Sequence, residues 1–199
     1  MNIAIIPARS GSKRIKGKNT KEFIGRPIVE YSFDVAKELK IDTIVSSNSI
    51  HIKELCVKNS MWYMQRSENN SDDKATIFQV LREVILYCRS QLETNYEYIL
   101  CLYPCAPLLR SEDVIKAYEE IEKYYIDGKW DCVLPITKDK KECGNFFWIS
   151  TKSLFETDDF SVPTNTIYYI MPEEIVQDIN TEEDWKIAEE KYKKLKGII

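Results

Sequence analysis

A cluster of basic residues follows the first apolar segment of the chain. The sequence begins MNIAIIPARSGSKRIKGKNTKEF, and after NIAIIP it carries two glycines, Gly11 and Gly17, among the basic residues Arg9, Lys13, Arg14, Lys16, Lys18 and Lys21. Backbone N–H groups and fixed cations together surround an anion well, and glycine lets the chain approach it closely. We call residues 8–20 the basic loop. Their types favour phosphate binding, with a solvated lysine-rich loop as the alternative.

The basic loop does not match two common phosphate-binding motifs. A Walker-type P-loop needs GxxxxGK followed by Ser or Thr, but Gly11 and Gly17 are one residue too far apart and Asn19 replaces the hydroxyl residue. The loop does not contain GxGxxG either. A phosphate site here is therefore of another type.

Alternating apolar and amphipathic segments predict the elements that must position this loop. Expected strands cover residues 2–7, 42–47, 61–65, 96–103, 130–136, 144–150, 166–171 and 174–179. Expected helices cover residues 28–40 and 50–59, the stretch containing residues 77–88, a stretch from residue 111, a short one after residue 150 and one from residue 181. Strands alternating with helices predict a Rossmann-like α/β fold with one doubly wound, mostly parallel sheet.

Helix starts are predicted from capping residues. Asp72 or Asp73 is expected to cap the helix that contains residues 77–88, and Ser111 the next one. Thr181 and Asp184 form a capping box for the last helix. That helix has one apolar stripe, made of Trp185, Ala188, Tyr192 and Leu195.

The position of the basic loop in this fold is informative. Ligands of doubly wound sheets bind beyond the carboxyl ends of the strands, which is where residues 8–20 must lie. The chain has no internal repeat and no Pro/Gly/Ser-rich linker, so residues 1–199 are expected to form a single domain.

Composition excludes several classes of function. The net charge of −4 argues against a nucleic-acid partner, and no apolar run is long enough to span a bilayer. The N-terminus lacks the features of a secretory signal, so a cytoplasmic location is expected. The 6 cysteines form no CxxC pair and read as buried reduced thiols, with zinc or disulfides as alternatives. His51 is the only histidine, and nothing around it indicates a catalytic triad.

IIPARSGSKRIKGKN resembles the opening motif of the sugar-activating cytidylyltransferases, a family that includes CMP-sialic acid synthetases and pseudaminic acid cytidylyltransferases. Three later segments resemble further motifs of that family: QRSENNSDDKAT (65–76), CLYPCAPLLR (101–110) and QDINTEEDWKIAE (177–189). The stretches RSEN, SDD and GNFFW lean towards the pseudaminic acid branch. The resemblance covers nearly the whole chain and implies a fold of the nucleotide-diphospho-sugar transferase type.

The resemblance implies a reaction and its participants. Such enzymes join CTP to a nine-carbon acidic sugar, with release of pyrophosphate. At the matching positions Arg9 and Lys13 would hold the triphosphate, and Lys18 would neutralise charge as pyrophosphate leaves. Further nucleotide contacts would come from Ala8, Gly11, Ser12, Asn19, Arg66 and Ser71. Sugar contacts would come from Tyr103, Pro104 and Phe147.

Several of these residues also have a purely structural interpretation. Pro104 could simply end a strand, and Ser71 could be a helix cap. Tyr103 and Phe147 could belong to the core, as aromatic residues in strands usually do.

The resemblance also implies a Mg²⁺ site at Asp178 and Asn180. The family has Asp-x-Asp here, and residues i and i+2 of a strand face the same way, so both side chains could share one ion. This chain has Asp178-Ile179-Asn180, which keeps an amide oxygen but loses one negative charge. Asn48 is a similar departure, because many relatives have Asp after the second strand.

A longer departure follows the fifth expected strand. Relatives have a protrusion there that supports dimerisation and supplies basic residues for the sugar carboxylate, whereas this chain has only TKDKKEC (137–143). A homodimer is therefore possible, but the family's dimerisation element is absent from this sequence. Two alternatives to an active enzyme for such a sugar also stay open. One is a catalytically impaired nucleotide-binding relative, and the other is a nucleotidyltransferase for another sugar such as 3-deoxy-octulosonate.

Overall fold

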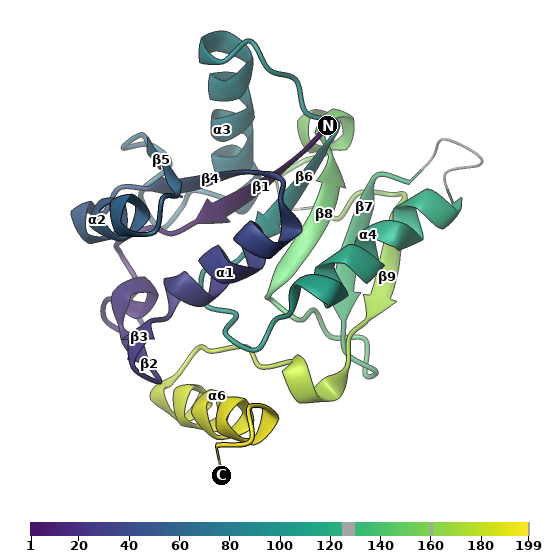
Figure 1. Ribbon diagram of the computed structural model, residues 1–199. Coiled ribbons are helices and arrows are strands. Elements are labelled where there is room, and N and C mark those ends of the chain that lie inside the picture. The colour runs from purple at the N-terminus through teal and green to yellow at the C-terminus, as the bar shows by residue number, and fades with distance from the viewer. Residues whose placement is uncertain (125–129, 160, 199) are drawn as a thin grey trace.

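The central element of the computed structural model is a seven-stranded sheet in the order β5-β4-β1-β6-β8-β7-β9 (Figure 1). The structure describes residues 1–124, 130–159 and 161–198. The strands are β1 (Asn2–Pro7), β4 (Asp42–Ser47), β5 (Trp62–Gln65), β6 (Tyr98–Leu102), β7 (Cys132–Ile136), β8 (Phe146–Ser150) and β9 (Thr166–Ile170). A separate two-stranded sheet pairs β2 (Glu22–Phe23) with β3 (Arg26–Pro27).

The sheet is mostly parallel, as the sequence predicts. β1 pairs in parallel with β4 and β6, placing Ile5 opposite Ile44 on one side and Cys101 on the other. β8 is antiparallel to both β6 and β7, and β9 is again parallel to β7. The carboxyl ends of β1 and β6 therefore meet at the same edge of the sheet, which is where a ligand of this fold class binds.

Helices cover both faces of the sheet, because successive strand residues point to opposite sides. Ala4 and Ile6 pack under helices α1, α2 and α4, whereas Ile3 and Ile5 pack under α3 and α5. The helices are α1 (Val29–Leu39), α2 (Ile50–Lys58), α3 (Ile77–Gln91), α4 (Ser111–Tyr124), α5 (Thr151–Glu156) and α6 (Glu182–Leu195). Among the described residues, no helix combines the length and the hydrophobicity that a bilayer-spanning segment requires.

A third, smaller core supports the basic loop from below. Ile15 of the loop is buried with Phe23, Trp185 and other apolar residues between the β2–β3 hairpin and α6. The rings of Phe23 and Trp185 meet edge to face, with their centroids 5.6 Å apart. This core packs α6, near the C-terminal end of the chain, against the basic loop that follows β1 (Figure 1).

The expected strand at residues 174–179 is wrong. The described chain instead has a short 3-10 turn, η3 (Glu173–Ile175), which follows Pro172. Ile175 and Ile179 are buried, but in the core under α1 and α4 and in the small core beside α6, respectively. The apolar pattern of this segment therefore reflects packing rather than sheet pairing.

Some expected helix details are also wrong. Neither Asp72 nor Asp73 caps α3; the cap is Thr76, which forms a capping box with Gln79. Ser111 is the first residue of α4, and its hydroxyl donates to Glu38 at 2.7 Å. The capping box of Thr181 and Asp184 is confirmed, although Leu195 at the end of that helix is exposed.

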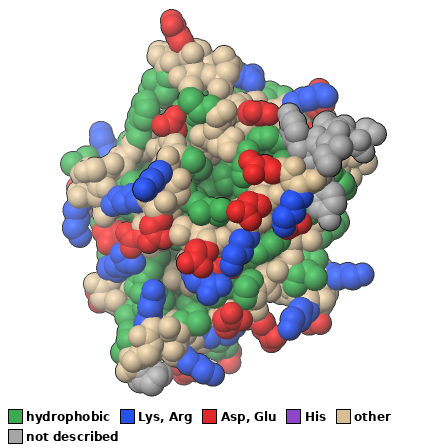
Figure 2. Space-filling view, turned by 45° about the vertical axis from the view of Figure 1, so that its right-hand side comes forward, with side chains coloured by type: hydrophobic (Ala, Val, Ile, Leu, Met, Phe, Trp, Pro, Cys, Tyr) green, Lys and Arg blue, Asp and Glu red, His purple; other side chains and the backbone are tan. Residues whose placement is uncertain are grey.

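Charged side chains of both signs are interspersed over the face of the molecule that Figure 2 shows.

The cysteines at positions 56, 88, 101, 132 and 143 are buried, Cys105 is half-buried, and all six are free thiols. Among the described residues, no group of three or more His, Cys, Asp and Glu side chains is arranged to hold a metal ion.

Candidate active site

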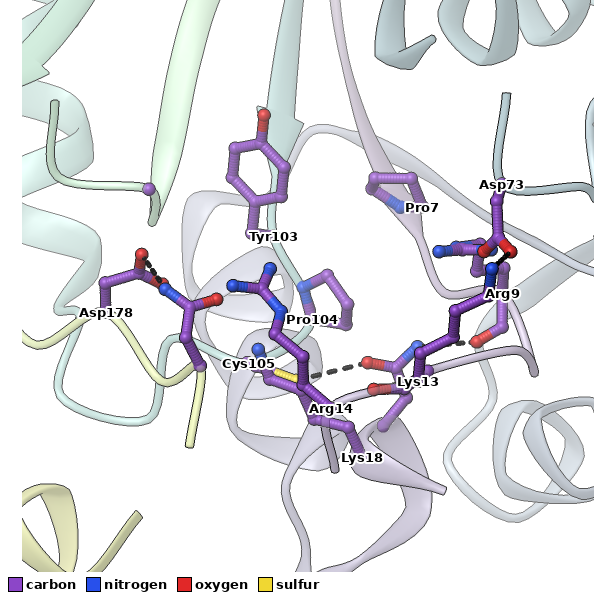
Figure 3. A pocket seen from close by; sticks show the side chains of 14 residues that line it. Pro7, Arg9, Lys13, Arg14, Lys18, Asp73, Tyr103, Pro104, Cys105 and Asp178 are labelled. Atoms are coloured by element: carbon purple, nitrogen blue, oxygen red, sulfur yellow. Dashed lines mark hydrogen bonds and ion pairs between the residues drawn. The ribbon is translucent and has the colours of Figure 1, made fainter. Parts of the chain in front are cut away.

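A cleft of about 640 Å³ lies at the carboxyl ends of β1 and β6 (Figure 3). The basic loop supplies Arg9, Ser12, Lys13, Arg14, Lys18 and Asn19 to its lining. The other lining residues are Pro7, Asp73, Tyr103, Pro104, Cys105, Gly144, Asp178 and Asn180. The cleft is therefore rich in cations at the point where the fold places ligands.

Not all of the basic residues near the N-terminus face the cleft. Lys16 is exposed and does not belong to the lining. Lys21 pairs with Glu182 and its ammonium lies 4.5 Å from the ring centroid of Trp185. Lys21 thus holds α6 in place, while Arg9, Lys13, Arg14 and Lys18 line the cavity.

Arg9 and Lys13 share one carboxylate. Arg9 Nη1 donates to Asp73 Oδ1 at 2.6 Å, and the Lys13 ammonium pairs with the other oxygen of Asp73. Hydrogen bonds from Lys13 and Arg9 lower the pKa of the Asp73 carboxyl. This arrangement keeps both cations turned into the cleft, where the phosphates of a ligand could replace Asp73 as their partner.

Lys18 and Asn19 connect the basic loop to other parts of the cleft. Gly17 has φ +62°, a left-handed conformation that glycine adopts without strain, and it leads into the 3-10 turn η1 (Lys18–Thr20). The Lys18 ammonium donates to the carbonyl of Ile179, between the two candidate metal ligands. Asn19 Nδ2 donates to the Arg9 carbonyl at 2.9 Å, and the Cys105 thiol donates to Asn19 Oδ1 at 3.1 Å.

Asp178 and Asn180 lie side by side opposite the loop, although they are not on a strand. The Asn180 amide donates to Asp178 Oδ2, and the Asn180 N–H donates to Asp184 Oδ2 at 2.9 Å. Gly144, beside Asp178, has φ +59°, a left-handed conformation that favours glycine; a Cβ there would make only an ordinary contact with Asp178 Cγ, at 3.5 Å. The pair offers carboxylate and amide oxygens, which suit a hard divalent cation that takes its remaining ligands from phosphates and water.

Four of the predicted nucleotide-binding residues lie outside the lining of the cleft. Arg66 is buried and donates to the Ser46 carbonyl at 2.7 Å, and burial lowers its pKa to about 10. Ala8 is buried, and both of its backbone groups are bonded, to Ser46 and Ser47. The Ser71 hydroxyl donates to the Ser67 carbonyl at 2.6 Å. Gly11 lies beside Arg9: a Cβ added at Gly11 would be 3.6 Å from the Arg9 guanidinium nitrogen Nη1.

The predicted sugar-binding residues divide between two adjoining cavities. Tyr103 and Pro104 line the cleft, whereas Phe147 lines a second cavity of about 210 Å³. Tyr103 and Gly144 border both cavities, and the rings of Tyr103 and Phe147 have centroids 6.3 Å apart. Burial raises the pKa of the Tyr103 phenol, which therefore stays protonated between the two spaces.

Asn48 and the short segment of residues 137–143 are the two other departures from the family pattern, and the structure shows the contacts of both. Asn48 Oδ1 accepts the backbone N–H of Ser10 at 2.9 Å, so it anchors the start of the basic loop. Residues 137–143 form a compact turn in which Thr137 N–H donates to the Lys141 carbonyl at 2.8 Å. Its lysines Lys138, Lys140 and Lys141 are exposed and do not line the cleft.

Five cleft residues were not among the predicted site residues: Pro7, Arg14, Asp73, Cys105 and Gly144. Arg14 had a clear signal, since it lies within the basic loop itself. Asp73 and Cys105 lie inside segments that resemble family motifs, but nothing in those segments indicates that they would meet the loop. The positive φ of Gly144 could not be read from its neighbours in the sequence.

A doubly wound α/β sheet with a cation-rich loop at the carboxyl end of its first strand defines a nucleotide-binding class of protein. The chain matches the family model described as cytidylyltransferase over residues 3–146. It therefore belongs to the cytidylyltransferase family and is a nucleotidyltransferase, in agreement with the resemblance of its motifs.

Individual relatives support this assignment. The chain is 29% identical to the pseudaminic acid cytidylyltransferase of Campylobacter jejuni subsp. jejuni serotype O:2, over 96% of either chain. It is 32% identical to the N-acylneuraminate cytidylyltransferase of Streptococcus agalactiae serotype III, over 75% of this chain and 35% of that protein. A solved CMP:2-keto-3-deoxy-manno-octonic acid synthetase in complex with CTP has the same fold, with a TM-score of 0.72, 12% identity and coverage of 98% and 99%.

Proposed function

We propose that this protein transfers CMP from CTP to a nine-carbon acidic sugar of the pseudaminic or sialic acid type, with release of pyrophosphate. The observation that carries the proposal is the convergence of four loop cations with Asp178 and Asn180 on one cleft. The relation to a pseudaminic acid cytidylyltransferase over nearly the whole chain supports the choice of sugar.

The reaction requires positioning and charge stabilisation from the protein. The anomeric hydroxyl of the sugar attacks the α-phosphorus of CTP, the bond from that phosphorus to the oxygen bridging to the β-phosphate breaks to release pyrophosphate, and the hydroxyl proton passes to solvent water. Negative charge accumulates on the departing pyrophosphate. Fixed cations that face this charge lower the barrier without forming a covalent intermediate.

The loop cations have distinct roles in this proposal. Arg9 and Lys13 exchange Asp73 for the β- and γ-phosphates when CTP enters. Arg9 offers a forked contact and Lys13 a movable point charge. Lys18, held against the Ile179 carbonyl, lies at the boundary between the loop and the Asp178 segment, where it can offset charge on the leaving group.

Asp178 and Asn180 would hold a Mg²⁺ ion. Bound there, the ion would offset phosphate charge. One carboxylate and one amide oxygen fit this ion, because Mg²⁺ takes most of its ligands from substrate phosphates and water in such sites. The hydrogen bonds from the Asn180 and Thr181 N–H groups to Asp184 fix the backbone that presents this pair.

The test is pyrophosphate release from CTP, with and without Mg²⁺, in the presence of individual nonulosonic acids. We expect release that depends on both the sugar and the ion, together with a CMP-sugar product in the mass spectrum. CTP binding without sugar-dependent release from any such acid would contradict the proposal and favour an impaired relative. Release with 3-deoxy-octulosonate alone would contradict the choice of sugar.

A further inference from the structure

Cys105 is a cleft residue to which the proposed function gives no role. It follows Pro104 just beyond β6, and its side chain lies on the floor of the cleft between Asp178 and Arg9 (Figure 3). Its thiol donates to Asn19 Oδ1 with a sulfur–oxygen distance of 3.1 Å. The contact joins the end of β6 to the end of the basic loop.

The Asn19 amide is held from both sides in one orientation. Its oxygen accepts from the Cys105 thiol, and its nitrogen donates to the Arg9 carbonyl at 2.9 Å. A carbonyl only accepts, so turning the amide over would set its oxygen against the Arg9 carbonyl and would also end the donation from the thiol. The Asn19–Arg9 bond closes the loop on itself, because it joins the end of the loop to its beginning. The Cys105–Asn19 bond ties that end to the segment after β6.

Cys105 is itself well anchored. Its side chain packs against the small core that includes Ile15 and Ile179, beneath the loop. Burial raises the pKa of this thiol to about 12, so the sulfur keeps its proton at neutral pH and remains a hydrogen-bond donor.

We infer that Cys105 is a positioning residue for nucleotide binding: its thiol orients the Asn19 amide, which in turn fixes the backbone of Arg9 where the triphosphate is received. This inference rests on the proposed function, because it takes CTP as the ligand of the loop. It predicts an effect on CTP affinity that is larger than any effect on turnover of the bound substrates.

The experiment compares Cys105→Ser, which keeps a donor, with Cys105→Ala, which removes it. Cys88→Ala is the matched control, because Cys88 is buried in α3, in the core on the other face of the sheet. CTP dissociation constants are measured by calorimetry, and kcat and KM by pyrophosphate release. Asn19→Ala and its combination with Cys105→Ala complete a double-mutant cycle.

We expect Cys105→Ala to raise the dissociation constant and the KM for CTP by about three- to tenfold, with kcat nearly unchanged, as for the loss of one hydrogen bond. Cys105→Ser and Cys88→Ala should stay within about twofold of the unmodified protein. In the Asn19→Ala background, Cys105→Ala should add little, because its partner is already gone.

Two outcomes would overturn the inference. Equal weakening in Cys105→Ser and Cys105→Ala, with equal losses of melting temperature, would assign the residue to packing. Additive effects of Cys105→Ala and Asn19→Ala would show that the two side chains act separately. Failure of the unmodified protein to bind CTP would contradict the proposed function itself. That failure is distinguishable from the two outcomes above, which are seen only in the variants.

Discussion

The two walls of the cleft differ in how they are built. One wall, proposed to hold the nucleotide and called the nucleotide wall, is the basic loop, which brings Arg9, Lys13, Arg14 and Lys18 from one continuous segment. The other, proposed to hold the metal and the sugar and called the acceptor wall, is assembled from separate segments around Gly144, Asp178 and Asn180, of which Asp178 is negatively charged. Several cations contribute charge to the nucleotide wall, whereas each contribution to the acceptor wall comes from a single residue.

The two walls also differ in the contacts that hold them and in the charge that they offer a ligand. The nucleotide wall is held at its start by the bond from the Ser10 N–H to Asn48 and at its end by the bond from Cys105, on the floor of the cleft, to Asn19. In the acceptor wall the Asn180 amide lies beside the Asp178 carboxylate, and the adjoining short turn of residues 137–143 contributes no cation to the cleft. Substrate phosphates and water can complete a metal shell, but they cannot replace preorganised cations.

Lys18→Ala should produce the largest effect, because Lys18 reaches from one wall to the other. We expect kcat to fall by about 10²–10³-fold, as for removal of one fixed charge-stabilising donor, while CTP affinity changes by less than about tenfold. Turnover is measured by pyrophosphate release and affinity by calorimetry.

Lys16→Ala is the matched control for Lys18→Ala. It removes the same charge from the same loop, but Lys16 is exposed and does not line the cleft. Equal loss of turnover in both variants would mean that the net charge of the loop matters more than the position of Lys18.

Opposite changes at the acceptor wall should have opposite effects on the metal requirement. Asp178→Asn removes its carboxylate and should raise the Mg²⁺ concentration for half-maximal activity by at least about tenfold. Asn180→Asp adds a second carboxylate and should lower it. A Mg²⁺ titration of pyrophosphate release measures both, and an unchanged requirement in both variants would place the ion elsewhere.

Residues that act within one segment were the easiest to predict. The rule that ligands bind beyond strand ends places the basic loop at the cleft, and the resemblance to the family singles out Arg9, Lys13, Lys18 and Asn19 within it. The parallel sheet and the Thr181–Asp184 capping box were predictable for the same reason, because each depends on a local pattern.

Residues that act through distant partners could not be predicted in this way. Asp73 meets Arg9 across 64 positions, and Cys105 meets Asn19 across 86. Arg66 is bonded to the Ser46 carbonyl, a contact that no local spacing reveals. The apolar residues of 174–179, at positions 175, 176 and 179, fit a strand and an extended segment under a helix equally well, so only tertiary packing decides between them.

Asp73→Asn tests whether the Asp73 carboxylate competes with CTP for the cations of the nucleotide wall. The charge that competes with phosphate for Arg9 and Lys13 is removed, so CTP should bind more tightly, by about two- to fivefold for exposed ion pairs. Calorimetry at low and high salt measures the change, which should shrink as salt rises. Asp139→Asn removes the same charge from the exposed turn and should leave affinity unchanged; weaker CTP binding in Asp73→Asn would instead show that the carboxylate preorganises the cations.

The smallest effect is expected from Asp184→Asn, which loosens the backbone behind the acceptor wall. Hydrogen bonds from the Asn180 N–H, then from the Thr181 hydroxyl and N–H, lower the pKa of this carboxyl below its unfolded value of about 3.9. Its stabilising contribution is therefore present above pH 4 and is lost as the pH falls through the folded-state pKa. Urea unfolding should show Asp184→Asn less stable than the unmodified protein at pH 7, with the difference shrinking towards pH 3. Glu183→Gln, an exposed change in the same helical turn, should show a smaller difference at pH 7; equal losses would assign the effect to the helix dipole rather than to these hydrogen bonds.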